Sequence, residues 1–494
     1  MIRKDSFDIL RIYRRDGLYL ITGSIVLIAF SFFISRLTAN NDIYMQLLAL
    51  EDIIVNFDFS SVGGHPIGIA LVSSFLKVFG ADPLVVFYYL QPFLSSVCFV
   101  LLFRMLITVI PNKFAFFIAL SSMTSLIIIK AMRQVTAEII ALTSILILMA
   151  YIWKIMILKK NINLSTIMCF IMLSWVVILF RNASLFIIVG ILLFLYLHDY
   201  FGIIPIIMIS FLVLAPMIIK SLFSMNLQSH YQNLFSIDAV INLITQMMKH
   251  MMNLTEIIIP YSLNLNSIPW LKLLIGFGCI SICLIIHNNK DIKELYGKRY
   301  LFGEFFMIIG LSYYCILSFT SVYLGSNSIF NTSWGDNYRV SGFGIIFLLT
   351  AFWIYMLCLN NSRKKYILIF LVLLSLSKIS YGLRYEIIAQ KHRFLFNDYR
   401  KTVESVRNLM RNEEKNDKLL IYTFGGWEGK NLYYMLKYYD LIYSLPFQVE
   451  RYIEPHGYEH AIILCVYPDL DNLNKKYTKY RSINNLEGVY SIDL

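Results

Sequence analysis

Charged residues are scarce in this chain. Asp, Glu, Lys and Arg make up 15% of its 494 residues, whereas hydrophobic residues make up 58%. A typical soluble protein has roughly 25% charged residues. Because intrinsic disorder requires low hydrophobicity, this composition excludes a disordered chain as well as an ordinary soluble enzyme. Apolar windows of about 19 residues recur along most of the sequence, which predicts a polytopic membrane protein.

Several familiar site motifs are also absent. The sequence has no GxxxxGK[ST] loop, no HExxH and no GxSxG, so ATPase, zinc-protease and α/β-hydrolase functions lack support. Six of the seven cysteines lie inside apolar segments, and no CxxC pattern occurs. The first long loop contains no Asp-x-Asp pair either. We therefore expect no disulfide framework, no metal and no cofactor.

The net charge of +12 is unevenly distributed. From Arg384 to the C-terminus there are 16 basic and 15 acidic residues, whereas the first 383 residues carry 27 and 16. A nucleic-acid-binding protein gathers its cations on one soluble face. Here they lie in short loops between apolar runs, so they indicate membrane topology, and no nucleic-acid partner is expected.

The apolar runs predict an all-α polytopic bundle of about eleven transmembrane helices in residues 1–383. A small extracytoplasmic α/β domain is expected in residues 384–494, with strands at KLLIYTF and HAIILCVYP. The loops on the N-terminal side carry more Lys and Arg, which predicts a cytoplasmic N-terminus and an extracytoplasmic C-terminus. The spans are expected near 18–36, 84–103, 113–130, 135–157, 164–180, 184–200, 203–220, 269–287, 300–324, 341–359 and 366–383.

Two outer segments are more than simple loops. Residues 37–80 contain four acidic residues and no Lys or Arg before Lys77, and PIGIALVSSFLKVFG within them predicts a short surface helix. Residues 221–267 include a stretch, 237–254, with its apolar and polar residues on opposite helical faces. That pattern is typical of a helix lying at the membrane interface.

Asp42 stands a few residues beyond the first expected span, at the boundary between water and lipid. Partial desolvation there raises the pKa of a carboxylate toward the range of a general base. Spacing alone favours a different role, because Asn41-Asp42 precedes an amphipathic run and an Asp in that position caps a helix. Both interpretations stay open at this point.

The sequence NDIY followed by GGHPIGIALVSSFLKVFG resembles the first outer loop of type C glycosyltransferases (GT-C), such as aminoarabinose transferases and protein mannosyltransferases. These membrane enzymes take a sugar from a polyprenyl phosphate or diphosphate. Their loop has an acidic residue after the first span, often a Tyr, and then a His/Lys-Pro-Pro turn that opens a helix ending in Phe-Gly. The matching positions are Asp42, Tyr44, His65, Pro66, Phe79 and Gly80. The sequence departs from the pattern at Ile67, where many members have a second Pro.

Three further segments match the same family. MRQVTAEII resembles the entry to the fourth span, which implies substrate binding by Arg133 and Glu138, although a structural ion pair between them is equally compatible. Arg181 lies at the outer end of the fifth span, where snorkelling to the interface is the alternative. The late loop GDNYRVSG resembles the family's Arg-Tyr loop in inverted order, as Tyr338-Arg339.

The resemblance implies an inverting glycosyltransferase in which Asp42 is the general base. Tyr44, His65, Arg133, Glu138, Arg181, Tyr338 and Arg339 would bind the substrates. The donor would be a polyprenyl-phosphate-linked sugar, and the acceptor a lipid, glycan or protein outside a bacterial inner membrane. One guanidinium group can bind two phosphate oxygens at once. Arginines at the outer ends of the helices are therefore suitable ligands for a lipid phosphate. The alternatives are a lipid-linked oligosaccharide flippase or transporter and a polysaccharide polymerase or ligase.

Overall fold

The structure is a computed structural model that carries no ligand. It describes residues 2–35, 41–56, 66–133, 135–157, 163–223, 237–259, 268–323, 337–359 and 364–392 in the bundle. Beyond these it describes 419–424, 437–438, 447–451, 460–465, 480–482 and 489–493. The statements below concern these residues.

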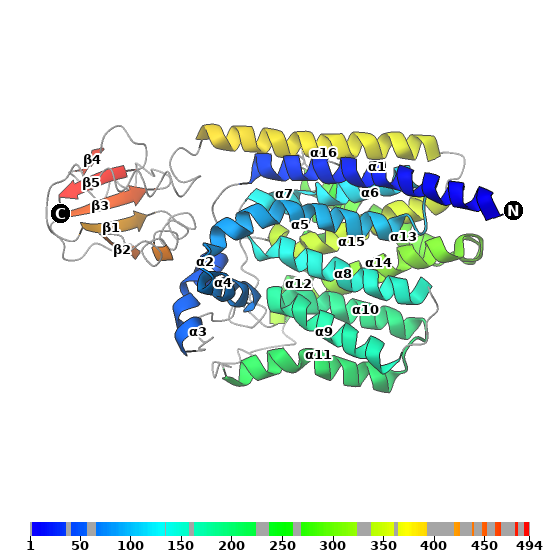
Figure 1. The fold of residues 1–494 in the computed structure, drawn as a ribbon, viewed down its shortest axis with the longest axis horizontal. Coiled ribbons are helices and arrows are strands. Elements are labelled where there is room, and N and C mark those ends of the chain that lie inside the picture. The colour runs from blue at the N-terminus through cyan, green and yellow to red at the C-terminus, as the bar shows by residue number, and fades with distance from the viewer. Residues whose placement is uncertain are drawn as a thin grey trace.

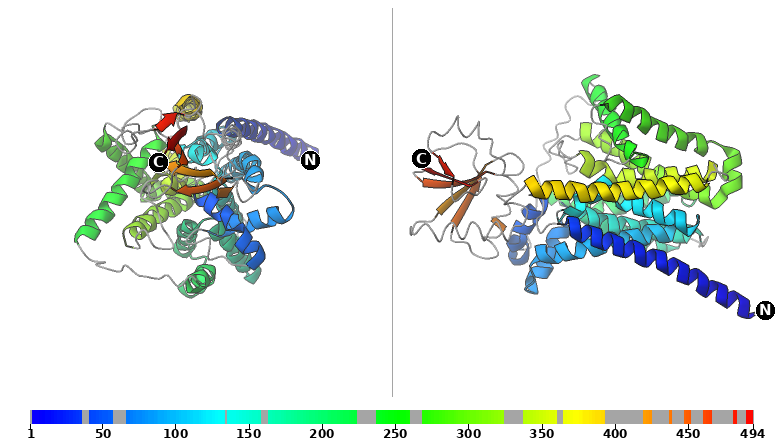
Figure 2. Two further views of the ribbon diagram at one scale, coloured as in Figure 1. Left: turned by 90° about the vertical axis from the view of Figure 1, so that its left-hand side faces the viewer. Right: turned by 90° about the horizontal axis from the view of Figure 1, so that it is seen from above.

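Long helices run side by side and alternate in direction along one axis (Figure 1). The five strands lie together at one end of the bundle, which we call the sheet side. The chain begins at the opposite end, the N-terminal side (Figures 1 and 2). The helices of the first half are α1 (Ile2–Ile34), α2 (Asn41–Leu48), α3 (Leu50–Asn56), α4 (Gly68–Val78), α5 (Pro83–Leu106), α6 (Asn112–Met123), α7 (Leu126–Arg133), α8 (Ala137–Ile157) and α9 (Leu164–Phe180).

The second half continues with helices of the same kind. A short 3-10 helix, η2, precedes α10, and a second one, η3, follows α12 directly. The bounds are η2 (Asn182–Ser184), α10 (Leu185–Leu197), α11 (Ile203–Phe223), α12 (Ile237–Asn253), η3 (Leu254–Ile257), α13 (Pro269–His287), α14 (Lys290–Tyr323), α15 (Asn337–Leu359) and α16 (Lys364–His392).

Seven of the described helices are long and apolar enough to cross a membrane, and the bent pair α6 and α7 makes an eighth if it is one span. The coarse prediction of an all-α membrane bundle is thereby confirmed. The expected count of eleven is not supported. α9 has 17 residues and α10 has 13, so at 1.5 Å per residue they reach roughly 20–26 Å, less than the roughly 30 Å of hydrocarbon in a bilayer.

The span expected over 113–130 is not one straight helix, because the helix is broken within it. α6 ends at Met123, α7 begins at Leu126, and the two axes are bent by 54°. Just before the break, the Ser122 and Thr124 hydroxyls donate to the carbonyls four residues earlier, at 2.9 and 2.8 Å. Such back-bonding bends helices, and hydropathy does not detect it because the whole stretch remains apolar.

α12 confirms the expected helix at 237–254. Its apolar residues Val240, Ile241 and Ile244 are exposed, whereas its polar residues Gln246 and His250 are buried against the bundle. A soluble helix buries its apolar face, so this reversed arrangement fits an apolar face turned toward lipid.

The strands form one five-stranded sheet with the order β2-β1-β3-β5-β4. β1 is parallel to β2 and β3, and β5 is antiparallel to β3 and β4. The bounds are β1 (Leu419–Phe424), β2 (Phe447–Arg451), β3 (His460–Cys465), β4 (Tyr480–Ser482) and β5 (Val489–Asp493). A separate α/β domain starting at residue 384 stays a prediction, because most of 393–494 lies outside the described residues and α16 runs on to His392.

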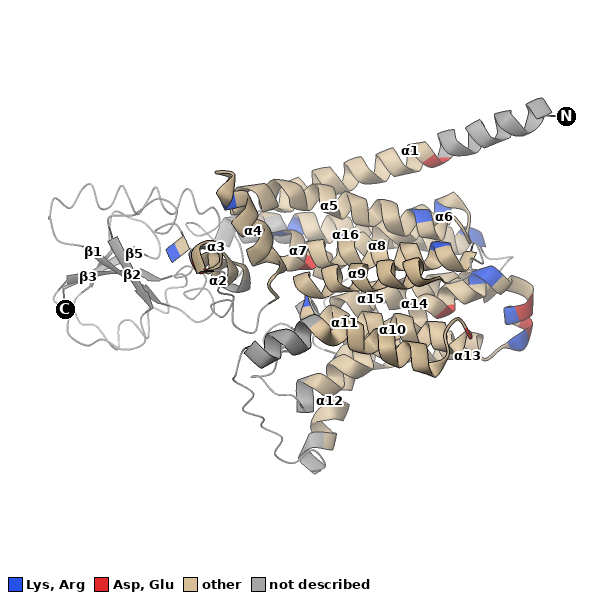
Figure 3. Cartoon of the chain, turned by 60° about the horizontal axis from the view of Figure 1, so that its bottom comes forward, with Lys and Arg blue, Asp and Glu red and all other residues tan. Residues whose placement is uncertain are grey.

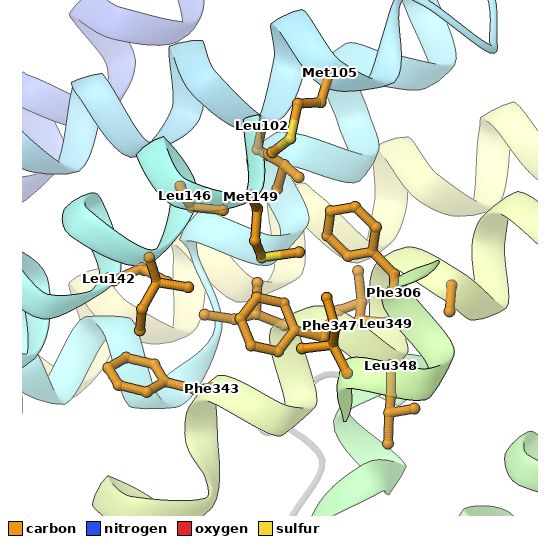
Figure 4. Packing of buried hydrophobic residues seen from close by; sticks show 14 of the residues in the cluster. Leu102, Met105, Leu142, Leu146, Met149, Phe306, Phe343, Phe347, Leu348 and Leu349 are labelled. Carbon is orange, nitrogen blue, oxygen red and sulfur yellow. The ribbon is translucent and has the colours of Figure 1, made fainter. Parts of the chain in front are cut away.

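The core of the bundle lies where α5, α8, α14 and α15 meet. Figure 4 shows Leu102 and Met105 of α5, Leu146 and Met149 of α8, and Phe306 of α14 packed together. Few charged residues lie along the middle of the described helices, and most of them gather at the helix ends (Figure 3). The buried ion pairs among the helices are therefore exceptions that require an explanation.

Close helix crossings depend on glycine. A Cβ at Gly276 of α13 would overlap the main-chain carbonyl oxygen of Met251 on α12, whereas a Cβ at Gly278 would meet nothing within 4 Å. Gly276→Ala is therefore expected to push α12 off α13 and to cost about 1–3 kcal/mol of stability. Thermal unfolding of the detergent-solubilised protein measures this, with Gly278→Ala as the matched control. Equal melting temperatures for the two variants would contradict the close packing.

Candidate functional site at the sheet side

A buried ion pair joins α8 to the end of α9. The Arg181 Nη1 atom lies 3.0 Å from the Glu138 Oε1 atom, and the two side chains are 11% and 3% exposed. Glu138 lies in the first turn of α8, where the helix dipole stabilises a carboxylate. Arg181 follows the last residue of α9 in an extended conformation, φ −159°, and so turns the chain into η2. Two predicted substrate-binding residues are thus brought into direct contact.

Two further helices hold the Arg181 guanidinium in place. It stacks over the Phe343 ring of α15, with its central carbon 4.6 Å from the ring centroid. The fully buried Tyr313 hydroxyl of α14 accepts a hydrogen bond from it. A guanidinium fixed by a carboxylate, a phenol and an aromatic face keeps one orientation.

Arg133 ends α7 at the same side of the bundle and is buried. The last carbonyls of α7 are capped by side chains from three other segments. Ser35 Oγ donates to the Met132 carbonyl at 2.7 Å, and Gln91 Nε2 and Thr136 Oγ1 both donate to the Ala131 carbonyl. Because these bonds satisfy the end of α7, the position of Arg133 is rigidly set.

Tyr44 is buried on α2 and lies against a residue that the sequence did not single out. Its ring centroid is 6.0 Å from that of Tyr438, which is itself fully buried. The Tyr438 hydroxyl donates to Asp82 Oδ1 at 2.9 Å, and Asp82 also caps the first turn of α5. Burial and the nearby Asp82 carboxylate raise the pKa of Tyr438, so the phenol stays a donor at neutral pH. The Asp-Pro pair at 82–83 is the signal that predicts such a cap.

Four predicted site residues have no described side chain. Asp42 is the second residue of α2, and Tyr338 and Arg339 lie in the first turn of α15, but only their backbones are described. His65 lies outside the described residues altogether. α2 begins at Asn41, which places Asp42 inside the first turn of the helix, where the dipole favours a carboxylate.

A second buried ion pair, which the sequence did not indicate, lies at the break between α6 and α7. Lys378 of α16 lies 4.0 Å from Glu256 of η3, and the side chains are 2% and 3% exposed. Lys378 interrupts the apolar run expected at 366–383, and an ionisable residue inside a span is the signal that could have revealed it. Glu256 lies in residues 221–267, which the sequence predicted to be an outer segment.

A third polar cluster lies at the N-terminal side. Glu304 of α14 contacts His198 at 3.3 Å and His287 at 3.7 Å. The Tyr300 hydroxyl is 3.0 Å from His287 Nδ1. This cluster is at the opposite end of the bundle from Arg133 and Arg181. Within the described part of the chain, no group of three or more His, Cys, Asp or Glu residues has a geometry that could hold a metal ion.

These features define an integral membrane protein with a helical bundle and buried polar contacts at both ends. The sequence matches no protein-family model, and no curated protein matches it. The site therefore has to be interpreted from its own chemistry.

Proposed function

We propose that the protein is an inverting membrane glycosyltransferase that moves a sugar from a polyprenyl phosphate or diphosphate to a lipid, glycan or protein acceptor. One observation carries the proposal: Arg133, the Arg181–Glu138 pair and α2, which contains Asp42, all lie toward the sheet side of the bundle. Buried arginines there suit the phosphate of a membrane-bound donor, and an acid on α2 at the same end of the bundle suits activation of the acceptor.

The proposal also covers the membrane, the topology and the roles of the site residues. The membrane is a bacterial inner membrane, with a cytoplasmic N-terminus and an extracytoplasmic sheet side. The apolar helices α9, α10 and α11, which are not among the eight candidates above, complete eleven spans, and residues 384–494 form an α/β domain. Asp42 is the base, and Tyr44, His65, Arg133, Glu138, Arg181, Tyr338 and Arg339 contact donor or acceptor. The reaction requires no strong general acid, because a lipid phosphate is already a good leaving group, and it uses no metal or cofactor.

A direct assay tests the reaction. Proteoliposomes that contain the full chain, a radiolabelled sugar on a polyprenyl phosphate and a membrane lipid extract are expected to yield labelled product with release of the lipid phosphate. If the intact donor instead crosses to the other leaflet with its sugar–phosphate bond unbroken, the protein is a flippase.

Phosphate recognition is expected to depend on Arg133. Arg133→Ala removes a charge-assisted hydrogen bond of about 1.5–3 kcal/mol and should weaken donor binding about ten- to a hundredfold. Arg133→Lys should restore only part of the affinity, because an ammonium cannot reproduce a bidentate fork. Equilibrium binding of labelled donor to the purified protein measures both variants, with exposed Arg104 of α5 changed to Ala as the control. Full rescue by Lys, or no loss with Ala, would reduce Arg133 to an interfacial anchor.

A transporter is the second candidate, and the break between α6 and α7 favours it. Discontinuous helices with buried charges at the break are typical of transporter substrate and ion sites. The Glu256–Lys378 pair occupies such a break.

A further inference from the structure

The Glu256–Lys378 pair lies between the two free helix ends of the break. Glu256 Oε1 accepts a hydrogen bond from the Leu126 main-chain N–H, the first of α7. Lys378 Nζ donates to the Ser121 carbonyl near the end of α6, at 3.1 Å. An anion thus lies at the positive end of one half-helix and a cation at the negative end of the other. Each charge stabilises the helix end that it contacts.

The Glu256 carboxylate and the Lys378 ammonium group are not hydrogen-bonded to each other. Their closest atoms are 4.0 Å apart, beyond hydrogen-bond distance. Glu256 Oε2 and the nearby Ser121 and Ser125 hydroxyls have no hydrogen-bond partner among the described residues, although all three atoms are buried. A carboxylate with one oxygen bonded and the other unbonded in an apolar interior is poised to take up a proton.

We propose that Glu256 and Lys378 form a proton-binding site that controls the bend between α6 and α7. The proton comes from water and binds to Glu256 Oε2, while Lys378 keeps its charge. The pair then changes from neutral to a net charge of +1. A neutral carboxylic acid is a weaker acceptor for the Leu126 N–H and no longer balances the positive end of α7. Proton uptake therefore releases the first turn of α7. This inference does not depend on which reaction the protein performs.

A line of buried polar residues leads along α12 to Glu256. Gln246, His250, Asn253 and Glu256 follow one another along the buried face of α12 and η3, and all four are buried. Both ring nitrogens of His250 lack a hydrogen-bond partner among the described residues, and its ring centroid lies 5.1 Å from that of Tyr314. This polar face continues along α12 to the break through an otherwise apolar interior. It marks the route by which a proton reaches Glu256.

The charged and titratable groups around the site come from four elements. Burial disfavours the charged form of Glu256 and raises its pKa, whereas Lys378 on α16 and Lys130 on α7 act electrostatically in the opposite direction. His250 on α12 stays neutral at neutral pH, because burial and then Lys249 lower its pKa to about 4. Cys279 on α13 is a buried thiol. The described side chains of α15 near the site, Gly342 to Trp353, include no charged residue.

Hydrogen exchange of the full-length protein in detergent tests the proposal. Amide exchange over 124–130 is followed by mass spectrometry from acidic to alkaline pH and corrected for the intrinsic chemical rate. In the wild type, protection of the first turn of α7 should fall roughly tenfold on acidification, since a charge-assisted hydrogen bond is about twice as strong as a neutral one. Glu256→Gln should show the low protection at every pH. The matched control Glu304→Gln, at another buried acid, should keep the wild-type profile.

The variant Lys378→Met tests whether the pair binds a proton or only holds the helices together, because only proton binding gives a pH midpoint that can shift. Removing the positive charge should move the midpoint of the transition to higher pH, because it disfavours the carboxylate. Three results would each overturn the proposal. The protection of wild-type α7 could stay the same at every pH, Glu256→Gln could show the same pH dependence as the wild type, or Lys378→Met could leave the midpoint unchanged. The wild-type profile decides even if a variant fails to fold.

Discussion

Asp42→Asn is expected to lower sugar transfer by ~100–10,000-fold, the range typical of losing a general base. Attack on the anomeric carbon requires the acceptor to lose its proton as the bond forms, and an amide cannot accept it. Asn keeps the size of the side chain, and the first turn of α2 tolerates it. Donor binding should therefore be largely retained while transfer is lost, which separate binding and transfer assays measure.

Asp52 provides the matched control. It lies on the neighbouring helix α3 with an exposed side chain, so Asp52→Asn should leave transfer unchanged. If Asp52→Asn or Asp58→Asn abolishes transfer while Asp42→Asn does not, the base is misassigned. If none of the acids in residues 37–80 matters, including Glu51, the glycosyltransferase proposal fails.

Breaking the Glu256–Lys378 pair from one side is expected to destabilise the protein by about 3–5 kcal/mol, because a buried charge is left without its partner. Lys378→Ala and Glu256→Ala each remove one charge and also one bond to a broken helix end. The double variant should cost clearly less than the sum of the two single changes. Reversible unfolding in detergent, with the wild type and all three variants, measures the coupling. Additive losses would show that the two residues act independently.

The loss in Lys378→Ala should also depend on pH. Burial raises the pKa of the Glu256 carboxyl, and Lys378 opposes that shift. Without the lysine the folded protein holds a proton that the unfolded chain has already released, so stability falls as the pH rises through this window. The stability deficit of the variant should therefore be larger at about pH 8 than at about pH 5.5. A deficit that is the same at both values would mean that Glu256 does not change its charge over this range.

Hydropathy and helix periodicity predicted most of the bundle. The expected spans at 135–157 and 269–287 agree closely with α8 and α13, because long apolar runs have few alternatives to helix in a membrane. The run at 164–180 also forms a helix, α9, with the expected bounds. The two faces of α12 were also predictable, since opposite faces of a helix follow directly from the spacing of its residues. The surface helix expected from PIGIALVSSFLKVFG forms as α4.

The break in the third apolar run was not predictable in the same way. A single window over 113–130 is apolar throughout, and the bend depends on side-chain bonds back to the backbone and on Glu256, which lies 130 residues away from Leu126. Local composition contains no information about a partner that distant in the chain.

The candidate site was likewise predictable from the sequence only in part. The resemblance of short motifs singled out Arg133, Glu138 and Arg181, and the helix directions placed them toward one end. Spacing along the chain allowed Glu138 to pair with Arg133, and the structure shows in addition that Glu138 pairs with Arg181, which follows α9. The sequence by itself determined that the chain enters a membrane as helices, because that outcome depends on how apolar each segment is. Only the tertiary structure decided which buried charges meet, because an ion pair requires atoms within about 4 Å, and such closeness arises only when separate helices pack.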